Sequence, residues 1–183
     1  MTQDARDLEH LFAACFRESH LTELVGGGTE PLYLPSEDPA RRPHRILYRE
    51  DFFASALHEV AHWCIAGPQR RRLEDFGYWY APDGRAASEQ AAFEAVEARP
   101  QALESIFSEA CGFEFHLSAD NLASGTGPGE RFAAAVEVER RRYLDRGLPL
   151  RAGIFRQALV ALKGRPPRRV LRPEAHRAAD RPA

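Results

Sequence analysis

The sequence predicts a single α+β domain of ordinary size with more helix than strand. Long segments repeat apolar side chains at helical spacing, and short apolar pieces bounded by Gly and Pro lie between them. The chain has 183 residues, of which 44% are hydrophobic and 28% charged, which is typical of a globular protein with a buried core. We assign residues 1–163 to this domain and residues 164–183, rich in Arg and Pro, to a disordered basic tail.

The clearest element is a helix over residues 51–66. Asp51 is a suitable N-cap, and Gly67 with Pro68 forms a stop signal. The other elements expected in the first half are a helix over 4–18 and short strands over 21–25, 31–34 and 45–49, with a break at the glycines 26–28.

The second half of the chain is mainly helical by its apolar spacing. A polar, aromatic loop over about 73–88 comes first. Two helical stretches follow, and they can form one helix bent at Pro100, because proline lacks a backbone N–H. The elements expected here are helices over 88–97, 100–110, 132–146 and 153–163, a strand over 112–117 and a Gly-rich loop over 124–129.

Charge, apolar runs and cysteines restrict the classes of function. The net charge of −2 does not call for nucleic acid as a partner, and only the basic tail offers a weak electrostatic contact with it. No apolar run is long enough for a bilayer and the first residues lack the features of a secretory signal, so we expect a cytoplasmic protein without membrane partners. The 3 cysteines are widely spaced and form neither a disulfide framework nor a CxxC pair.

The strongest functional signal is an HExxH motif inside the expected helix, formed by His58, Glu59 and His62. Residues i and i+4 of a helix lie one above the other, so both imidazoles can bind one metal ion. Glu59 follows the first histidine, where it can reach a metal-bound water, and we expect it to act in catalysis.

A catalytic ion usually takes three protein ligands, and the third histidine of the extended HExxHxxGxxH pattern is missing here. We therefore expect a carboxylate from a later helix: Glu97 first, Glu94 as the alternate, and Glu104 as a third candidate. His116 is a further possible ligand. Because Glu97 and Glu94 are three residues apart, one can ligate while the other orients a histidine. With zinc such a triad supports hydrolysis, and with iron(II) it supports dioxygen chemistry; the residues leave both open.

Several segments resemble the bacterial elongation factor P hydroxylases. The similarity starts around the HExxH motif, covers about residues 8–163 and is carried by 53–67, 75–85, 93–97, 100–103 and 120–122. The resemblance implies a small zincin-like fold with an HExxH helix, a carboxylate-donating helix and a few short strands. It also implies hydroxylation of one lysine side chain of elongation factor P after a β-lysyl group has been attached to it.

The same resemblance implies a divalent metal bound by His58, His62 and a carboxylate in the region of Glu97. We expect iron(II) first, with zinc or manganese as alternatives, and elongation factor P as the protein partner. The sequence contains no 2-oxoglutarate-binding pattern of a strand-borne HxD with a distal His and Arg, so the electron donor stays open.

The loop over 75–85 is expected to form a wall for the substrate. Aromatic faces attract ammonium groups, carboxylates can pair with the amines of a lysyl-lysine arm, and an arginine can bind an acidic patch of the partner. Ordinary roles are the alternatives: core packing for the aromatic rings, a turn for the Pro-Asp-Gly sequence and solvation for the arginine. We assign substrate binding to Tyr78, Tyr80, Asp83, Arg85, Asp120 and Asn121.

Two other functions fit the same residues. A small zinc metallopeptidase would use the HExxH site, and its Glu59→Gln variant would lose peptide cleavage while retaining zinc. A non-enzymatic module that binds translation factors would keep its partner after His58→Ala and would cause no covalent change.

Overall fold

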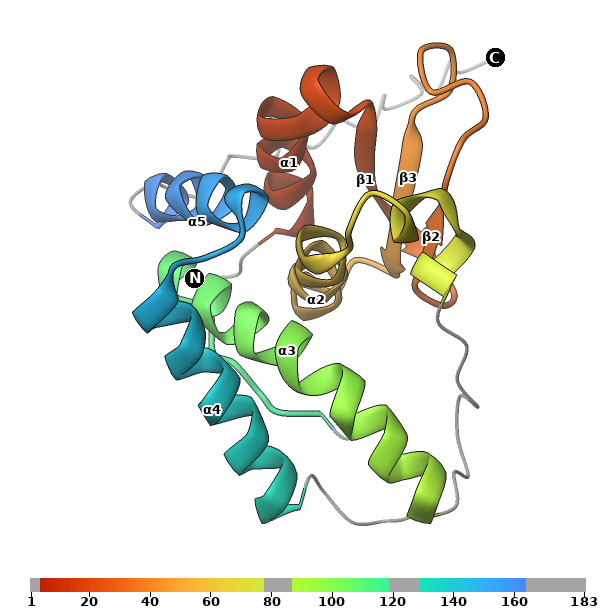
Figure 1. Ribbon diagram of the computed structural model, residues 1–183. Coiled ribbons are helices and arrows are strands. Elements are labelled where there is room, and N and C mark those ends of the chain that lie inside the picture. The colour runs from red at the N-terminus through yellow and green to blue at the C-terminus, as the bar shows by residue number, and fades with distance from the viewer. Residues whose placement is uncertain (1–3, 78–86, 119–128, 164–183) are drawn as a thin grey trace, which may run out of the picture.

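The computed structural model describes residues 4–77, 87–118 and 129–163, and it has the expected α+β architecture. In Figure 1 a small sheet lies on one side, α2 lies at the centre, and α3, α4 and α5 lie on the other side. The elements are α1 Ala5–His20, β1 Thr22–Gly28, β2 Leu32–Leu34, β3 His44–Arg49, α2 Phe53–Ile65, the 3₁₀ turns η1 Arg70–Arg72 and η2 Glu74–Gly77, α3 Ala87–Cys111, α4 Glu130–Arg146 and α5 Leu150–Leu162.

The sheet has the strand order β1-β3-β2, with β3 parallel to β1 and antiparallel to β2. The break expected at the glycines 26–28 is not there. Strand β1 continues through them, with a shift of register between Val25 and Gly28. Gly27 has a φ of 90°, which a glycine adopts without strain. Gly26 is required for space, because a Cβ there would lie 2.6 Å from the hydroxyl oxygen of Tyr48.

Helix α2 is the central element of the core. It packs against the sheet, α3, α1 and α5 (Figure 1), and Leu57, Val60 and Trp63 on it are fully buried. The helix begins at Phe53, so the expectation that Asp51 is its N-cap is wrong: Phe52 holds that position and forms no side-chain cap hydrogen bond. Burial of the apolar face therefore stabilises this helix more than its cap does.

Two guanidinium groups bind the carboxyl end of α2. Arg151 Nη2, from α5, donates to the carbonyl oxygens of Trp63, Cys64 and Ala66 at 2.9, 3.1 and 2.7 Å. Arg71 Nη1 donates to the same Ala66 oxygen at 2.5 Å. The last carbonyls of a helix lack intrahelical partners and carry partial negative charge, so these two cations satisfy and stabilise them.

The two stretches expected around Pro100 form one helix, α3, which packs against α2, α4 and α5. A buried polar stripe runs along it at i, i+4, i+7 and i+11, and consists of Glu97, Gln101, Glu104 and Ser108. Because burying a polar group costs free energy unless it is paired, the two carboxylates and the amide of this stripe require partners outside α3, whereas the Ser108 hydroxyl is buried without a hydrogen bond to any described residue.

The segment that follows α3 is not a strand, although its apolar residues alternate over 112–117. Its end pairs with a side chain instead of a strand: Gln101 Nε2 donates to the Ser118 carbonyl oxygen at 2.8 Å, and the Ser118 N–H donates to Gln101 Oε1 at 3.1 Å. One amide side chain thus supplies the two bonds that a neighbouring strand would have supplied.

Two further expectations concern membrane-spanning helices and the cysteines. None of the helices in the described ranges combines the length and the apolar content needed to cross a membrane. Cys15, Cys64 and Cys111 are all free, and the last two are buried. The tail 164–183, the Gly-rich segment up to residue 128 and the aromatic loop from residue 78 lie outside the described residues.

Candidate metal centre

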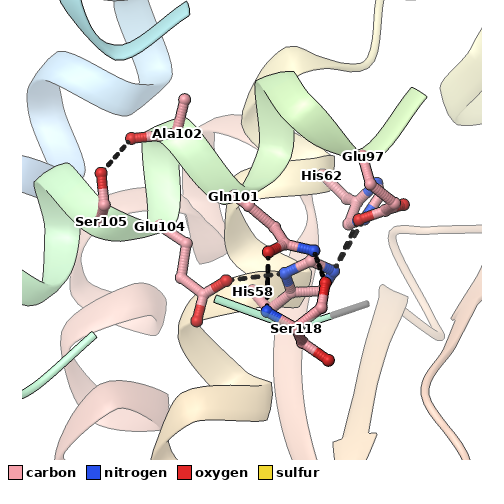
Figure 2. A network of polar contacts seen from close by, with 8 residues as sticks. All are labelled: His58, His62, Glu97, Gln101, Ala102, Glu104, Ser105 and Ser118. Atoms are coloured by element: carbon pink, nitrogen blue, oxygen red, sulfur yellow. Dashed lines mark hydrogen bonds and ion pairs between the residues drawn. The ribbon is translucent and has the colours of Figure 1, made fainter. Parts of the chain in front are cut away.

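The two histidines of the HExxH motif lie one turn apart on α2 and face α3. Their Nε2 atoms are 3.0 Å apart, and their side chains are 24% exposed for His58 and 11% exposed for His62. Figure 2 shows both rings pointing toward the same carboxylate from the neighbouring helix. The helical spacing has therefore brought both imidazoles to one point, as the motif predicted.

Glu97 of α3 closes this cluster. Its Oε2 lies 3.3 Å from His58 Nε2, and its Oε1 lies 3.3 Å from His62 Nε2. One ligand atom from each of the three residues lies within 4.8 Å of the others. Burial alone would raise the pKa of Glu97, but the two histidines hold it well below its usual range.

The donor set fits a divalent cation. Two imidazole nitrogens and one carboxylate are ligands that zinc, iron and manganese accept in proteins. In addition, Glu97 Oε2 is buried and forms no hydrogen bond among the described residues, although it lies 3.3 Å from His58 Nε2. Burying a carboxylate oxygen with no hydrogen bond costs free energy, and a cation between the two atoms would satisfy both.

Glu104 holds His58 from the opposite side of the ring, at 2.8 Å between its Oε2 and His58 Nδ1 (Figure 2). Because a carboxylate only accepts, the proton of this hydrogen bond is on Nδ1, and Nε2 is directed toward Glu97. Burial alone would lower the pKa of His58, but Glu104 and Glu97 raise it well above its usual value. The same two carboxylates favour a metal cation at Nε2 as they favour a proton there.

A strained turn forms a wall of the site beside His62. Asp75 and Phe76 have φ values of 46° and 57°, a left-handed conformation that costs about 1–2 kcal/mol per non-glycine residue. Three contacts hold it: Asp75 Oδ1 accepts from the Tyr33 N–H at 2.8 Å, Phe76 stacks on the Tyr33 ring at 4.3 Å, and Arg70 Nη1 donates to the Phe76 carbonyl oxygen at 3.0 Å. The turn places the Phe76 ring parallel to the His62 ring, 6.5 Å away.

A cavity of about 520 Å³ opens next to His62. The end of α2, residues 66–70 and one turn of α3 enclose it, and two of its lining residues are Arg70 and Arg99. Volumes of this order are typical of small-ligand sites, and the cavity offers a side chain a way to the histidine cluster.

The structure separates the candidate acids of α3 by role. Glu97 lies in the cluster and Glu104 hydrogen bonds to His58, whereas Glu94 lies outside the cluster and accepts from Gln90 Nε2 at 3.2 Å. His116 is 76% exposed and likewise outside the cluster. The substrate residues expected from the sequence, Tyr78, Tyr80, Asp83, Arg85, Asp120 and Asn121, lie outside the described residues.

Glu59 is partly buried on α2, and burial raises its pKa although His62 and His58 lower it. Gln101, by contrast, was missed as a site residue. It stands between Glu97 and Glu104 and fixes Ser118, which directly precedes the segment 119–128 (Figure 2). The sequence could have predicted this role of Gln101, because the spacing i, i+4, i+7 places Glu97, Gln101 and Glu104 on one helix face.

The fold and the cluster define a class: an α+β domain in which two histidines from one helix and a carboxylate from the next form a candidate 2-His-1-carboxylate metal site. Comparison with known proteins then gives the family. The Elongation factor P hydroxylase family matches residues 11–171 of the chain. A protein of Haemophilus influenzae named "Elongation factor P lysine hydroxylase" is 48% identical over 162 residues, which cover 88% of this chain and 90% of that protein. The chain belongs to the elongation factor P hydroxylase family.

Proposed function

We propose that this protein is an oxidoreductase that hydroxylates a lysine side chain of translation elongation factor P, and that His58, His62 and Glu97 hold the metal ion this requires. Family membership over most of the chain supports the reaction and the substrate protein. The convergence of the two histidines on the buried carboxylate of Glu97 supports the site, and it is the observation that carries the proposal.

A divalent ion bound there, iron(II) in this proposal with zinc or manganese as the alternatives, would supply open coordination positions for dioxygen chemistry. The residues of the chain would orient the ligands and shape the site around the ion. Glu104 fixes the ring of His58 and its tautomer, and Phe76 covers one side of His62. We assign to Glu59 the orientation of water or oxygen at the site, or the support of its ligands, since it is partly buried on α2 and the charges of His62 and His58 act on it.

The modified lysine, carrying its β-lysyl group, has to reach the histidine cluster. The cavity of about 520 Å³ beside His62 is large enough for a side chain, but Arg70 and Arg99 on its lining would repel the positive amines of this arm, so the carboxylates expected in substrate binding have to come from other segments. Tyr78, Tyr80, Asp83 and Arg85 follow Gly77 at the end of the strained turn, and Asp120 with Asn121 follows Ser118, which Gln101 fixes beside the cluster. Both connections support a role of these six residues in substrate binding.

The family favours hydroxylation over the other two functions that the residues allow, a zinc metallopeptidase and a non-enzymatic module. The intact mass of elongation factor P distinguishes all three. We would co-express β-lysylated factor with the native chain, with His62→Ala, or with Glu109→Ala, an exposed carboxylate on α3 that serves as the matched control.

A gain of one oxygen atom is expected with the native chain and with Glu109→Ala, and no gain with His62→Ala. Fragments of the factor would indicate a peptidase. An unchanged mass with β-lysylation verified and the native chain folded and metal-loaded would contradict the proposal.

A further inference from the structure

A second cavity, of about 610 Å³, lies between the segment that follows α2 and the end of the sheet where β1 and β3 begin. Arg71, Arg72, His20, His44, Ser36 and Glu37 line it. The Tyr33 and Phe76 rings, stacked at 4.3 Å, separate it from His62. Its lining is therefore distinct from the residues of the candidate metal centre.

An excess of positive charge distinguishes this second cavity, since two arginines and one acid line it. Within the described ranges the guanidinium of Arg72 has no hydrogen bond or ion pair, and it is exposed to the cavity. Arg71 uses one N–H on the Ala66 carbonyl oxygen, and the fork of a guanidinium has further N–H groups to offer. Glu37 is the one acid among the lining residues, and it is exposed and makes no ion pair with any described residue.

His44 adds a fixed donor to these charges. The Ser36 N–H donates to His44 Nδ1 at 2.8 Å. A backbone N–H can only donate, so Nδ1 is an acceptor here and the ring proton is on Nε2 in the neutral form as well. The Ser36 hydroxyl lines the same cavity and accepts from the Asp38 N–H at 3.2 Å, which leaves its own hydrogen to donate.

Two histidines on the walls have lowered pKa values, chiefly because they are partly buried, and nearby arginines add to the effect. Burial and then the charge of Arg71 lower the pKa of His44. Burial, Arg151 and Arg71 lower the pKa of His20. A pocket in which cations oppose further protonation is one that an anion would stabilise.

We propose that this cavity is a binding site for a small molecule that carries a phosphate or carboxylate group, held by Arg72, Arg71 and His44. Its volume is in the range of small-molecule sites rather than of an extended protein interface. The guanidinium fork and the N–H and O–H donors match the oxygens of either group.

Titration calorimetry with inorganic phosphate and with succinate, in a low-salt buffer without competing anions, tests the proposal. The variants are Arg72→Gln, Arg72→Lys and Arg156→Gln, the last an exposed arginine on α5 that makes no ion pair with any described residue. Binding of at least one probe should saturate at one site. Arg72→Gln should weaken it about tenfold or more, as the loss of a charge-assisted hydrogen bond requires, Arg72→Lys less, and Arg156→Gln not at all.

His62→Ala is the second control, because it removes a proposed metal ligand and His62 is not among the residues that line the second cavity. Binding should be unchanged in it, and the His44 ring signals should shift in NMR spectra during the titration. Binding of phosphate alone would assign a phosphate ligand, and binding of succinate alone a carboxylate. The proposal is overturned if neither probe saturates, if Arg72→Gln and Arg156→Gln behave alike, or if His62→Ala abolishes binding.

Discussion

Glu104 offers the most direct test of how this site is built. Its carboxylate lies 2.8 Å from His58 Nδ1, which is the ring nitrogen that does not face Glu97. The side chain of Glu104 is 9% exposed. Loss of such a carboxylate behind a ligating histidine typically costs 10- to 100-fold in metal affinity, or about 1.4–2.8 kcal/mol. Because Glu104 is buried, little water can replace its carboxylate at His58. We therefore expect the loss of metal affinity in Glu104→Ala to fall in the upper half of that range.

Glu104→Gln separates charge from hydrogen bonding. Its amide oxygen can still accept from Nδ1–H and hold the ring, but the neutral group no longer raises the basicity of the ring. The affinity of Glu104→Gln should therefore lie between those of the native chain and Glu104→Ala.

The assay is competition for zinc between the metal-free protein and a chromophoric chelator, because zinc does not change its redox state. Glu109→Ala is the matched control, since Glu109 lies on α3 but is 69% exposed and pairs with Arg140. The reasoning would be refuted if Glu104→Ala bound zinc as tightly as Glu109→Ala. A circular dichroism spectrum of each variant shows whether α3 is intact.

Three further predictions concern the scaffold around the site. Arg151→Met removes three hydrogen bonds at the end of α2, so the free energy of unfolding in urea should fall by about 2–4 kcal/mol, while Arg156→Met on the same helix should change it little. Gly26→Ala should cost about 1–3 kcal/mol in the same assay because its methyl group meets a tyrosine hydroxyl at 2.6 Å, whereas Gly153→Ala, with open space inside α5, should stabilise by about 0.5–1 kcal/mol. Gln101→Leu should raise the hydrogen exchange rate of the Ser118 amide, and an unchanged rate would show that the side chain does not hold this segment.

The part of the site that lies on one helix was predictable from the sequence. The i, i+4 spacing of His58 and His62 fixes their relative position within α2, and the structure brings them together. The choice between Glu97 and Glu94 is different in kind. It depends on how α3 is rotated about its axis against α2, which apolar spacing in α3 alone leaves uncertain by one turn.

Two fold predictions that were wrong have similar causes. The residues over 112–117 alternate as a strand would, but a strand also needs a neighbour, and here Gln101 provides the bonds instead. Asp51 has the right chemistry for an N-cap, yet α2 starts at Phe53, since burial of Phe53 and Leu57 decides where the helix begins. Local preference thus gave way to tertiary packing at both places.

The division of the cluster between two helices has a thermodynamic consequence. His58 and His62 come from α2 and Glu97 from α3, so an ion held by all three would act as a cross-link between the two helices. The outermost ligands, His58 and Glu97, are 39 residues apart in the sequence. The unfolded chain does not present these ligands together, so every gain in metal affinity is also a gain in folding stability. At a free metal concentration of 100 times the dissociation constant, this linkage adds about 2.7 kcal/mol. The melting temperature would then rise with the metal supply, and a chain starved of metal would lose this part of its stability together with its activity.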